Sequence, residues 1–241
     1  MEREREELKR AAGHYAADFV TDGMIIGLGS GSTARYATLR IAERLREGSL
    51  ANIVAVPTSN ETARLAQSEG IPLTRLNALV EGKGERSAKD GKLIDLTIDG
   101  ADEVDPCLHL IKGLGGFLLR EKIVASVTRR EIIVVDESKL VETLGTHSPV
   151  PVEVVRFGWR VTCAALERTG ACVRLRMRNG QPYVTDERHF IIDCRYEAIP
   201  SPYELARALE AIPGVVGHGL FLGMTHAVVI ASSDRVWVKE K

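Results

Sequence analysis

The sequence predicts an α/β protein with a doubly wound parallel sheet and a second, smaller α+β domain. Short apolar runs alternate with segments of helical period up to residue 136, an order typical of parallel sheets. The rhythm changes near Pro149, Val150 and Pro151, and the elements that follow have the order β-α-β-β-α-β of a ferredoxin-like unit. A last pair of apolar runs predicts a hairpin that returns to the first domain.

Composition narrows the class of protein before any motif is considered. The chain has 241 residues, of which 44% are hydrophobic and 27% charged, as in ordinary soluble domains. A net charge of −1 gives no reason to expect nucleic acid or an anionic membrane as a partner. The longest apolar runs are far shorter than a membrane span of about 18 residues, and the N-terminus is charged rather than signal-like. Four scattered cysteines without metal-ligand spacing predict reduced thiols in a cytosolic protein.

The predicted elements of the first domain follow from the periodicity of apolar residues and from the glycines that interrupt it. Apolar residues at helical spacing predict a first helix over residues 8–20, and the next helix, from residue 34, ends at Gly48. Polar, glycine-rich residues 78–91 predict a solvated loop. The remaining elements are predicted as strands at 24–28, 53–56, 71–76, 93–98 and 131–136, and helices at 60–67 and from 118.

The second domain is predicted to contain the strands and helices of the ferredoxin-like order. The strands are expected at 152–157, 172–177, 190–194 and 215–221, and the helices at 162–169 and 202–211. The returning hairpin is expected at 227–231 and 236–238.

A glycine loop at residues 27–33 joins the first predicted strand to the next helix. Its glycines allow backbone N–H groups to approach an anion, and the helix N-terminus adds a positive end. The dinucleotide fingerprint requires glycine where Ser32 stands, and the Walker A loop requires lysine there. We therefore expect the loop to hold a single small phosphate, with a tight turn that binds nothing as the alternative.

Acids, a lysine and a second glycine loop come together between residues 95 and 122. The strand at 93–98 ends in Asp99, Asp102 and Glu103, and a short apolar run then leads to Lys112 and its glycines. A helix with Glu121 in its first turn follows. Because open α/β sheets bind ligands beyond the carboxyl ends of their strands, this stretch predicts a site.

Several motifs together resemble the type A family of ribose-5-phosphate isomerases. They are GLGSGSTA, IDGADEVD, IKGLGGFLLREKIVAS, DESKLV, PVPVEVV and IPGVVGHGLFLG, which cover most of the chain in the order of the family. The resemblance implies a Rossmann-like catalytic domain (residues 1–148 and 223–241) with a ferredoxin-like domain (149–222) inserted near its end. It also implies interconversion of ribose 5-phosphate and ribulose 5-phosphate in the pentose phosphate pathway, with neither cofactor nor metal.

The resemblance assigns roles to individual residues. Glu121 becomes the base that moves a proton between carbons, and Lys112 stabilises the enediolate. Asp99 and Asp102 bind sugar hydroxyls and assist ring opening or the movement of a proton from oxygen to oxygen. The other expected substrate-binding residues are Ser30, Gly31, Ser32, Thr33, Gly100, Ala101, Gly113, Leu114, Gly115, Lys139 and Lys9. A cytoplasmic homodimer or homotetramer acting on a sugar phosphate is expected.

Other interpretations of these residues stay open. Glu121 and Lys112 could form a plain ion pair, and Asp99, Asp102, Glu103 and Asp105 could chelate a divalent cation. His14 and His109 are expected to pack or face solvent. The competing functions are a non-catalytic sugar-phosphate sensor, which should carry a helix-turn-helix, and a coenzyme A transferase relative with a nucleophilic glutamate.

Leu114 departs from the family pattern, because a glycine usually stands in its place. The loop can still work if φ at this residue stays negative. The loop at residues 78–91 also looks longer than the family requires, and we expect it to lie at the opposite end of its strand from Asp99, roughly 20 Å away.

Overall fold

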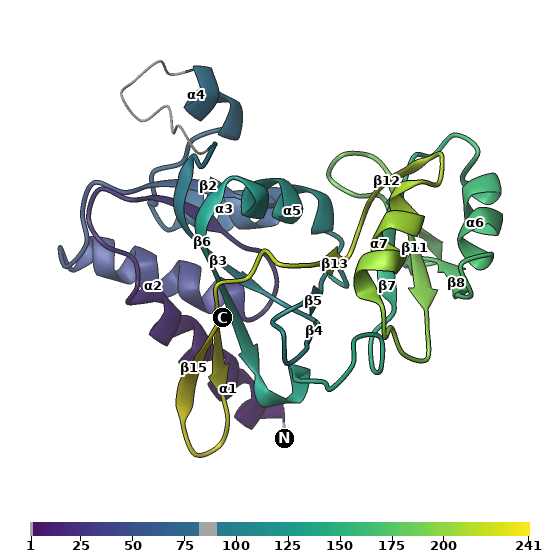
Figure 1. Ribbon diagram of the computed structural model, residues 1–241. Helices are drawn as coiled ribbons and strands as arrows, with labels where there is room; N and C mark the ends of the chain where they lie inside the picture. Colours follow the sequence, from purple (N-terminus) through teal and green to yellow (C-terminus); the bar gives the residue numbers. More distant parts are fainter. Residues whose placement is uncertain (1, 82–90) are drawn as a thin grey trace. The chain divides into compact units, whose positions relative to one another are not determined.

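The computed structural model describes residues 2–81 and 91–241, which form two compact units (Figure 1). The first unit comprises Met1–Gly100, Arg120–Ser138 and Met224–Lys241, and the second comprises Ala101–Leu119 and Lys139–Gly223. The predicted domain limits at residues 148 and 222 stay a prediction. The second unit contains residues 149–222 and, in addition, residues 101–119 and 139–148.

The first unit is built on a six-stranded sheet with the order β15-β14-β6-β3-β1-β2. Its strands are β1 (Ile25–Leu28), β2 (Val54–Pro57), β3 (Ile94–Gly100), β6 (Thr128–Asp136), β14 (Ala227–Ala231) and β15 (Val236–Glu240). Neighbouring strands are parallel except for the edge pair β14 and β15. The doubly wound parallel sheet and the returning hairpin are therefore confirmed.

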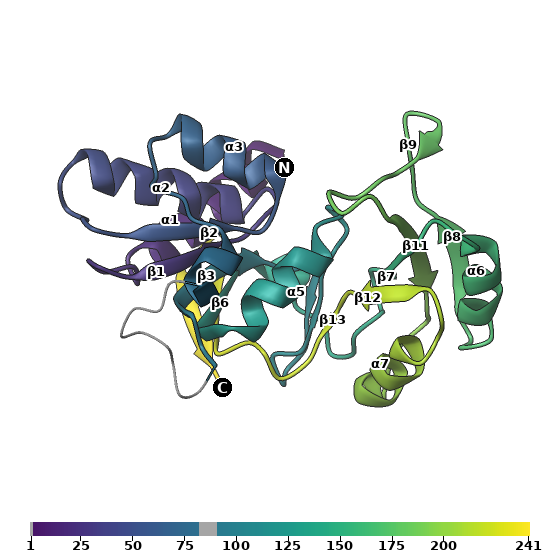
Figure 2. The same ribbon diagram turned by 90° about the horizontal axis from the view of Figure 1, so that it is seen from above.

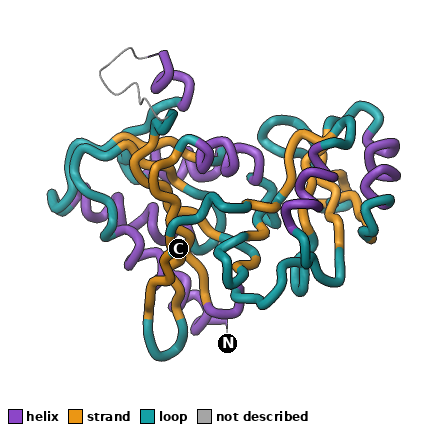
Figure 3. Tube along the Cα trace, viewed as in Figure 1, coloured by secondary structure: helices purple, strands orange, loops and turns teal. Residues whose placement is uncertain are grey.

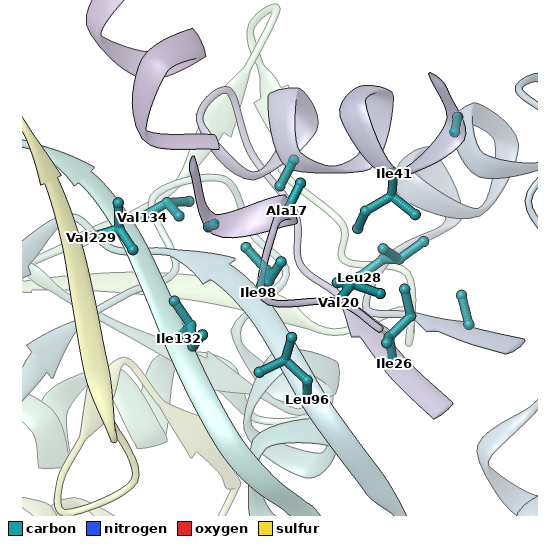
Figure 4. Close-up of a cluster of buried hydrophobic side chains, with 14 of the residues drawn as sticks. Ala17, Val20, Ile26, Leu28, Ile41, Leu96, Ile98, Ile132, Val134 and Val229 are labelled. Carbon is teal, nitrogen blue, oxygen red and sulfur yellow. The ribbon is translucent and has the colours of Figure 1, made fainter. Parts of the chain in front are cut away.

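Helices cover both faces of this sheet (Figure 2). They are α1 (Glu2–Ala17), α2 (Ala34–Arg46), α3 (Asn60–Ser68), α4 (Leu76–Glu81) and α5 (Leu118–Ser126). On one face, α1 and α2 bury alanines and Ile41 against the sheet, where Leu28 and Ile98 belong to the same cluster (Figure 4). On the other face, Val124 of α5 packs with Val56 and Ile94. Burial of apolar surface between these helices and the sheet holds the carboxyl ends of the strands in place relative to the first turns of the helices.

Two predictions for the region between β2 and β3 are wrong in part. The strand expected at residues 71–76 is reduced to a single parallel bridge between Leu73 and Ala55. Pro72 lacks an N–H for a longer ladder, and the chain turns into α4 instead. The loop expected at 78–91 begins with this helix, and residues 82–90 lie outside the described part of the chain.

The second unit contains a four-stranded antiparallel sheet with the order β12-β7-β11-β8. Figure 3 marks strands in orange and helices in purple. The main elements of the second unit are β7 (Val150–Val154), α6 (Trp159–Glu167), β8 (Cys172–Leu175), β11 (Phe190–Arg195), α7 (Pro202–Glu210) and β12 (Val215–His218). Leu166 of α6 and Leu209 of α7 share one apolar cluster with Val152 and Ile192, so both helices pack on the same face. This order and layering confirm the ferredoxin-like prediction.

Short strands complete the second unit. They are β4 (Glu103–Val104), β5 (Leu110–Ile111), β9 (Met177–Arg178), β10 (Gln181–Pro182) and β13 (Leu220–Phe221), with the 3-10 turn η1 (Glu137–Lys139) at the junction of the units. The strand expected at 215–221 divides into β12 and β13, because Gly219 bonds to Pro151 and Lys112 instead of continuing one ladder. A side chain at Gly219 would come within 2.1 Å of the Lys112 carbonyl oxygen. Among the described residues, none of the helices has the length and apolar character needed to cross a membrane.

Candidate active site

In the first unit, the predicted phosphate loop leaves the carboxyl end of β1. We call residues 29–33 the serine loop. The Ser30 side chain is buried, and its hydroxyl bonds to the hydroxyls of Thr58 (2.8 Å), Ser59 (2.8 Å) and Thr62 (3.0 Å). These partners follow β2 or begin α3, so two neighbouring strand ends share one hydroxyl network. Ser30 therefore supports the loop from behind.

Asp99 ends β3 beside the serine loop and is only 1% exposed. Its Oδ1 accepts the N–H of Ser30 (3.1 Å) and the N–H of Gly100 (2.7 Å). A side chain on Gly29 would come within 2.3 Å of the same oxygen, so only glycine allows this approach. Because these N–H bonds orient the carboxylate, Asp99 is fixed at the strand end where sequence placed it.

The rest of the serine loop is open to solvent at the start of α2. Gly31 and Ser32 are exposed, Thr33 is half-buried, and the Thr33 side chain makes no capping bond. Backbone N–H groups at such a helix start are suited to an anion. Lys9 of α1 instead bonds to Glu6 (2.5 Å), which also accepts the Tyr36 hydroxyl (2.8 Å).

Glu121 occupies the first turn of α5, where the helix dipole favours an ionised carboxylate. Its side chain is only 5% exposed. A carboxylate that is shielded from bulk water and held on a helix is a suitable proton carrier, since its mobility is confined to a few side-chain torsions.

In the second unit, Lys112 begins a loop of residues 112–116, which we call the lysine loop. Lys112 is 2% exposed, and its Nζ lies 5.4 Å from the centre of the Phe221 ring. Its N–H donates to the Gly219 carbonyl (2.8 Å), which ties the loop to the chain between β12 and β13. The φ angle of Leu114 is not positive, so a leucine can take the place of the usual family glycine without backbone strain.

Asp102 faces the lysine loop. Its Oδ2 accepts the N–H of Leu114 at 2.9 Å. Burial raises the pKa of Asp102, while the Leu114 N–H and the positive charges of Lys112, Lys139 and Arg176 lower it in part. Four predicted residues are thus close enough to interact within this unit: Asp102, Lys112, Leu114 and Lys139. Gly100 and Ala101 link Asp99 to Asp102 along the chain.

Glu103 and Asp105, two of the acids that could have chelated a divalent cation, each accept hydrogen bonds from backbone N–H groups. Glu103 is buried and accepts the N–H groups of Gly145 (2.7 Å), His147 (2.7 Å) and Ser148. Asp105 accepts the N–H groups of two residues in its own turn, at 2.8 and 2.9 Å. Within the described residues, the metal-type side chains that come together are Asp105, Cys107 and His109. The structure therefore does not bring Asp102 and Glu103 into one ligand set.

Comparison with known proteins identifies the family. Residues 54–235 match the family model described as ribose 5-phosphate isomerase A (phosphoriboisomerase A). The chain belongs to this family. It is 52% identical to the ribose-5-phosphate isomerase A of Gloeobacter violaceus over 96% of this chain and 95% of that protein. It is 49% identical to the ribose-5-phosphate isomerase A of Chloroflexus aurantiacus over 96% of this chain and 92% of that one.

Solved structures agree with the assignment to the ribose 5-phosphate isomerase A family. The ribose 5-phosphate isomerase of Plasmodium falciparum is 38% identical and superposes with a TM-score of 0.90, covering 98% of this chain and 99% of that one. A D-ribose-5-phosphate isomerase in complex with phospho-erythronic acid is 37% identical, with the same TM-score and coverage.

In this isomerase family member, the residues that bind the carbonyls of the lysine loop were not predicted from the sequence. Arg176 donates to the carbonyls of Gly113 (2.8 Å) and Leu114 (2.9 Å), and it is paired with Asp193. The Tyr183 hydroxyl donates to the Gly115 carbonyl at 3.4 Å. These residues lie more than sixty positions along the chain from the loop, so no local pattern could have indicated them.

Proposed function

We propose that the chain is an aldose–ketose isomerase that interconverts D-ribose 5-phosphate and D-ribulose 5-phosphate in the non-oxidative branch of the pentose phosphate pathway. Membership of the ribose 5-phosphate isomerase A family over nearly the whole chain carries this proposal. The buried acids and the buried lysine described above are of the types that the reaction needs.

The reaction moves a carbonyl between C1 and C2 of the open-chain sugar. A base must take the proton from C2 of the aldose, and the same group can return it to C1. We assign this role to Glu121, because a carboxylate can act first as base and then as acid. Its burial in the first turn of α5 supports the assignment.

Proton removal leaves negative charge on the oxygens of an enediolate. We assign its stabilisation to the ammonium of Lys112 and to the N–H groups of Gly113, Leu114 and Gly115. Fixed donors act most strongly where water is excluded, and Lys112 is 2% exposed. That Leu114 already donates to the Asp102 carboxylate supports a donor face that receives anionic oxygen.

The two aspartates are assigned to the sugar hydroxyls. Asp99 is held by two N–H bonds and so presents a fixed acceptor. Asp102, whose pKa is raised by burial, is better able than an ordinary aspartate to take up and release a proton. We therefore assign to Asp102 the proton transfers between oxygens. One opens the sugar ring, and the other takes the proton from the C2 hydroxyl and delivers it to the C1 oxygen as the carbonyl moves. Gly100 and Ala101 set the distance of Asp102 from Asp99 along the chain.

The phosphate is assigned to the serine loop. Gly31, Ser32 and Thr33 offer exposed N–H and hydroxyl donors at a helix start, and Ser30 braces the loop from below. Lys139 and Lys9 add positive charge in this assignment. The ion pair of Lys9 with Glu6 offsets part of the charge of Lys9.

We further propose a cytoplasmic enzyme that works as a homodimer or homotetramer with neither metal nor other cofactor. The four cysteines are free thiols, which is usual in the reducing cytosol. Apolar side chains that face solvent on the single chain, such as Phe157 (94% exposed) and Val161 (77% exposed), support self-association. Light scattering on a size-exclusion column measures the assembly directly.

The test of the function is formation of ribulose 5-phosphate from ribose 5-phosphate in the presence of EDTA. Glu121→Gln keeps the size of the side chain but cannot take a proton from carbon, so kcat should fall by about 10²–10⁴-fold. Binding of phospho-erythronic acid, measured by calorimetry, should persist in this variant. Activity within threefold of wild type would overturn the role of Glu121. Binding without turnover by the wild-type protein would instead indicate a sugar-phosphate sensor.

A further inference from the structure

Arg176 connects the sheet of the second unit to the lysine loop. Its Nε and Nη2 bind the two carboxylate oxygens of Asp193 on β11, with an Nε–Oδ2 distance of 3.0 Å. Its Nη1 donates to the carbonyl oxygens of Gly113 (2.8 Å) and Leu114 (2.9 Å). The guanidinium is largely buried, and its backbone N–H donates to Ile191 of the same sheet (2.9 Å). The guanidinium of Arg176 is therefore held by Asp193 on one edge and binds the carbonyls of the lysine loop on the other.

The contacts fix the direction of two successive peptide groups. In a trans peptide the C=O and the following N–H point in opposite directions. The peptide between Gly113 and Leu114 has its oxygen on Arg176 and its N–H on Asp102 (2.9 Å), so it is held at both edges. The next peptide also has its oxygen on Arg176. Its N–H, which belongs to Gly115, must therefore point to the side that Asp102 occupies.

Successive N–H groups that point the same way form a small concave site for anionic oxygen. The Asp102 carboxylate already binds one of the two N–H groups, which shows that this face of the loop accepts negative charge. We propose that Arg176, held by Asp193, is a positioning residue that directs the Gly115 N–H towards the enediolate oxygen. The inference rests on the proposed isomerase function and on the role of the lysine loop in it.

Arginine is suited to this task and lysine is not. A guanidinium carries five N–H donors in a rigid plane, and four of them are used here, two on Asp193 and two on the loop carbonyls. A lysine ammonium could reach one of these partners but could not hold both carbonyls in one plane with the aspartate. Arg176→Lys therefore keeps the positive charge but loses the planar set of N–H donors that binds Asp193 and both loop carbonyls.

The second unit contains a matched control for this arrangement. The loop at residues 145–148 has its N–H groups on Glu103 and its carbonyls of Thr146 (3.0 Å) and His147 (2.5 Å) on Arg195. It is thus held by an acid at its N–H groups and by an arginine at its carbonyls, as the lysine loop is, with the difference that Arg195 is exposed and Arg176 is largely buried. No proposed catalytic or binding residue lies in it. Arg195→Lys should reproduce the structural cost of losing such a clamp without affecting the chemistry.

The experiment compares Arg176→Lys, Asp193→Asn and Arg195→Lys with the wild-type protein, by steady-state kinetics on ribose 5-phosphate and by thermal unfolding. Fixed donors to a developing oxyanion are typically worth about 10²–10³-fold in kcat, and a misdirected donor should cost about 10–100-fold. We expect that loss in kcat for Arg176→Lys, with KM within about threefold, because the donor acts mainly in the transition state. Asp193→Asn should show the same pattern to a smaller degree, and Arg195→Lys should lower Tm with kcat within about twofold.

Arg176→Lys with wild-type kcat, or kcat losses in all three variants that follow their Tm, would overturn the inference. If Arg176→Lys does not fold, the kcat and KM of Asp193→Asn decide in the same way. Absence of turnover by the wild-type protein would overturn the proposed function and this inference with it. Wild-type turnover combined with an unaffected Arg176→Lys overturns only this inference.

Discussion

The serine loop and the lysine loop are both rich in glycine, but they are held in different ways. The serine loop is braced by the ends of neighbouring parallel strands, through the Ser30 hydroxyl network and the Asp99 carboxylate. The lysine loop is gripped at opposite peptide edges by Asp102 and by Arg176 of a different sheet. The first arrangement follows from strand order, whereas the second depends on contacts between distant parts of the sequence.

The difference matches the separate roles proposed for the two loops, phosphate binding for the serine loop and enediolate stabilisation for the lysine loop. A phosphate group stays bound throughout the reaction, so a loop fixed by the sheet itself serves it well. The enediolate exists only briefly, and donors directed at it must be aimed more closely. The clamp of Asp102 and Arg176 supplies this aim to the lysine loop.

Among changes to the two loops, the largest effect on kcat is expected from Lys112→Met, which removes the side-chain charge of the lysine loop and leaves its backbone in place. We expect kcat to fall by about 10²–10³-fold with a smaller rise in KM, because the ammonium interacts most strongly with the developing oxyanion. Steady-state kinetics on ribose 5-phosphate measure both constants. A change confined to KM would show that Lys112 binds substrate without selective stabilisation of the transition state.

Gly29→Ala should test the serine loop through stability. The added Cβ would lie 2.3 Å from Asp99 Oδ1 and 2.5 Å from Asp99 Cα, so the end of β3 must shift. We expect a loss of about 1–3 kcal/mol in the free energy of unfolding, measured with urea. Gly100→Ala is the control, because its Cβ would meet neighbours only at 3.9 Å. Equal stability of the two variants would contradict the tight approach of Gly29 to Asp99.

A smaller effect is expected from the titration of Asp102. Burial raises its pKa above the ordinary value of 3.8, so the folded protein keeps this proton to a higher pH than the unfolded chain does. The free energy of unfolding should therefore lose this contribution as pH rises between the two pKa values. Asp102→Asn removes it, so the variant should gain stability relative to wild type across that interval. Urea unfolding at several pH values tests this, and a difference independent of pH would contradict it.

The smallest effect is expected from shortening the segment at residues 78–91, of which residues 82–90 lie outside the described part of the chain. Replacing residues 83–89 by a glycine-containing turn should leave kcat/KM nearly unchanged. Halving a loop changes its closure entropy by only about 0.6 kcal/mol, so stability should also move little. A tenfold loss of kcat/KM with the fold intact would show that the segment reaches a substrate site.

The sequence predicted what depends on strand order and on short spacing. The serine loop, Asp99 and Glu121 each sit where a strand ends or a helix begins, and the structure has them there. It did not predict Arg176, because the loop carbonyls that Arg176 binds are over sixty residues away, and it did not predict Asp193, because the partner of Asp193 is Arg176. The strand expected at 215–221 failed for a related reason, since Gly219 bonds to Lys112 over a still larger separation in the sequence.

In the proposed mechanism, Glu121 moves a proton between C2 and C1 through an enediolate. Isomerisation of ribose 5-phosphate in D₂O, followed by NMR, tests it most directly. Wild-type protein should deliver solvent deuterium to C1 of ribulose 5-phosphate in those turnovers in which the proton on Glu121 exchanges with solvent before it is returned. Glu121→Gln should lose both turnover and deuterium incorporation by at least about 10²-fold while still binding phospho-erythronic acid. Deuterium incorporation by Glu121→Gln at the wild-type rate would contradict the claim.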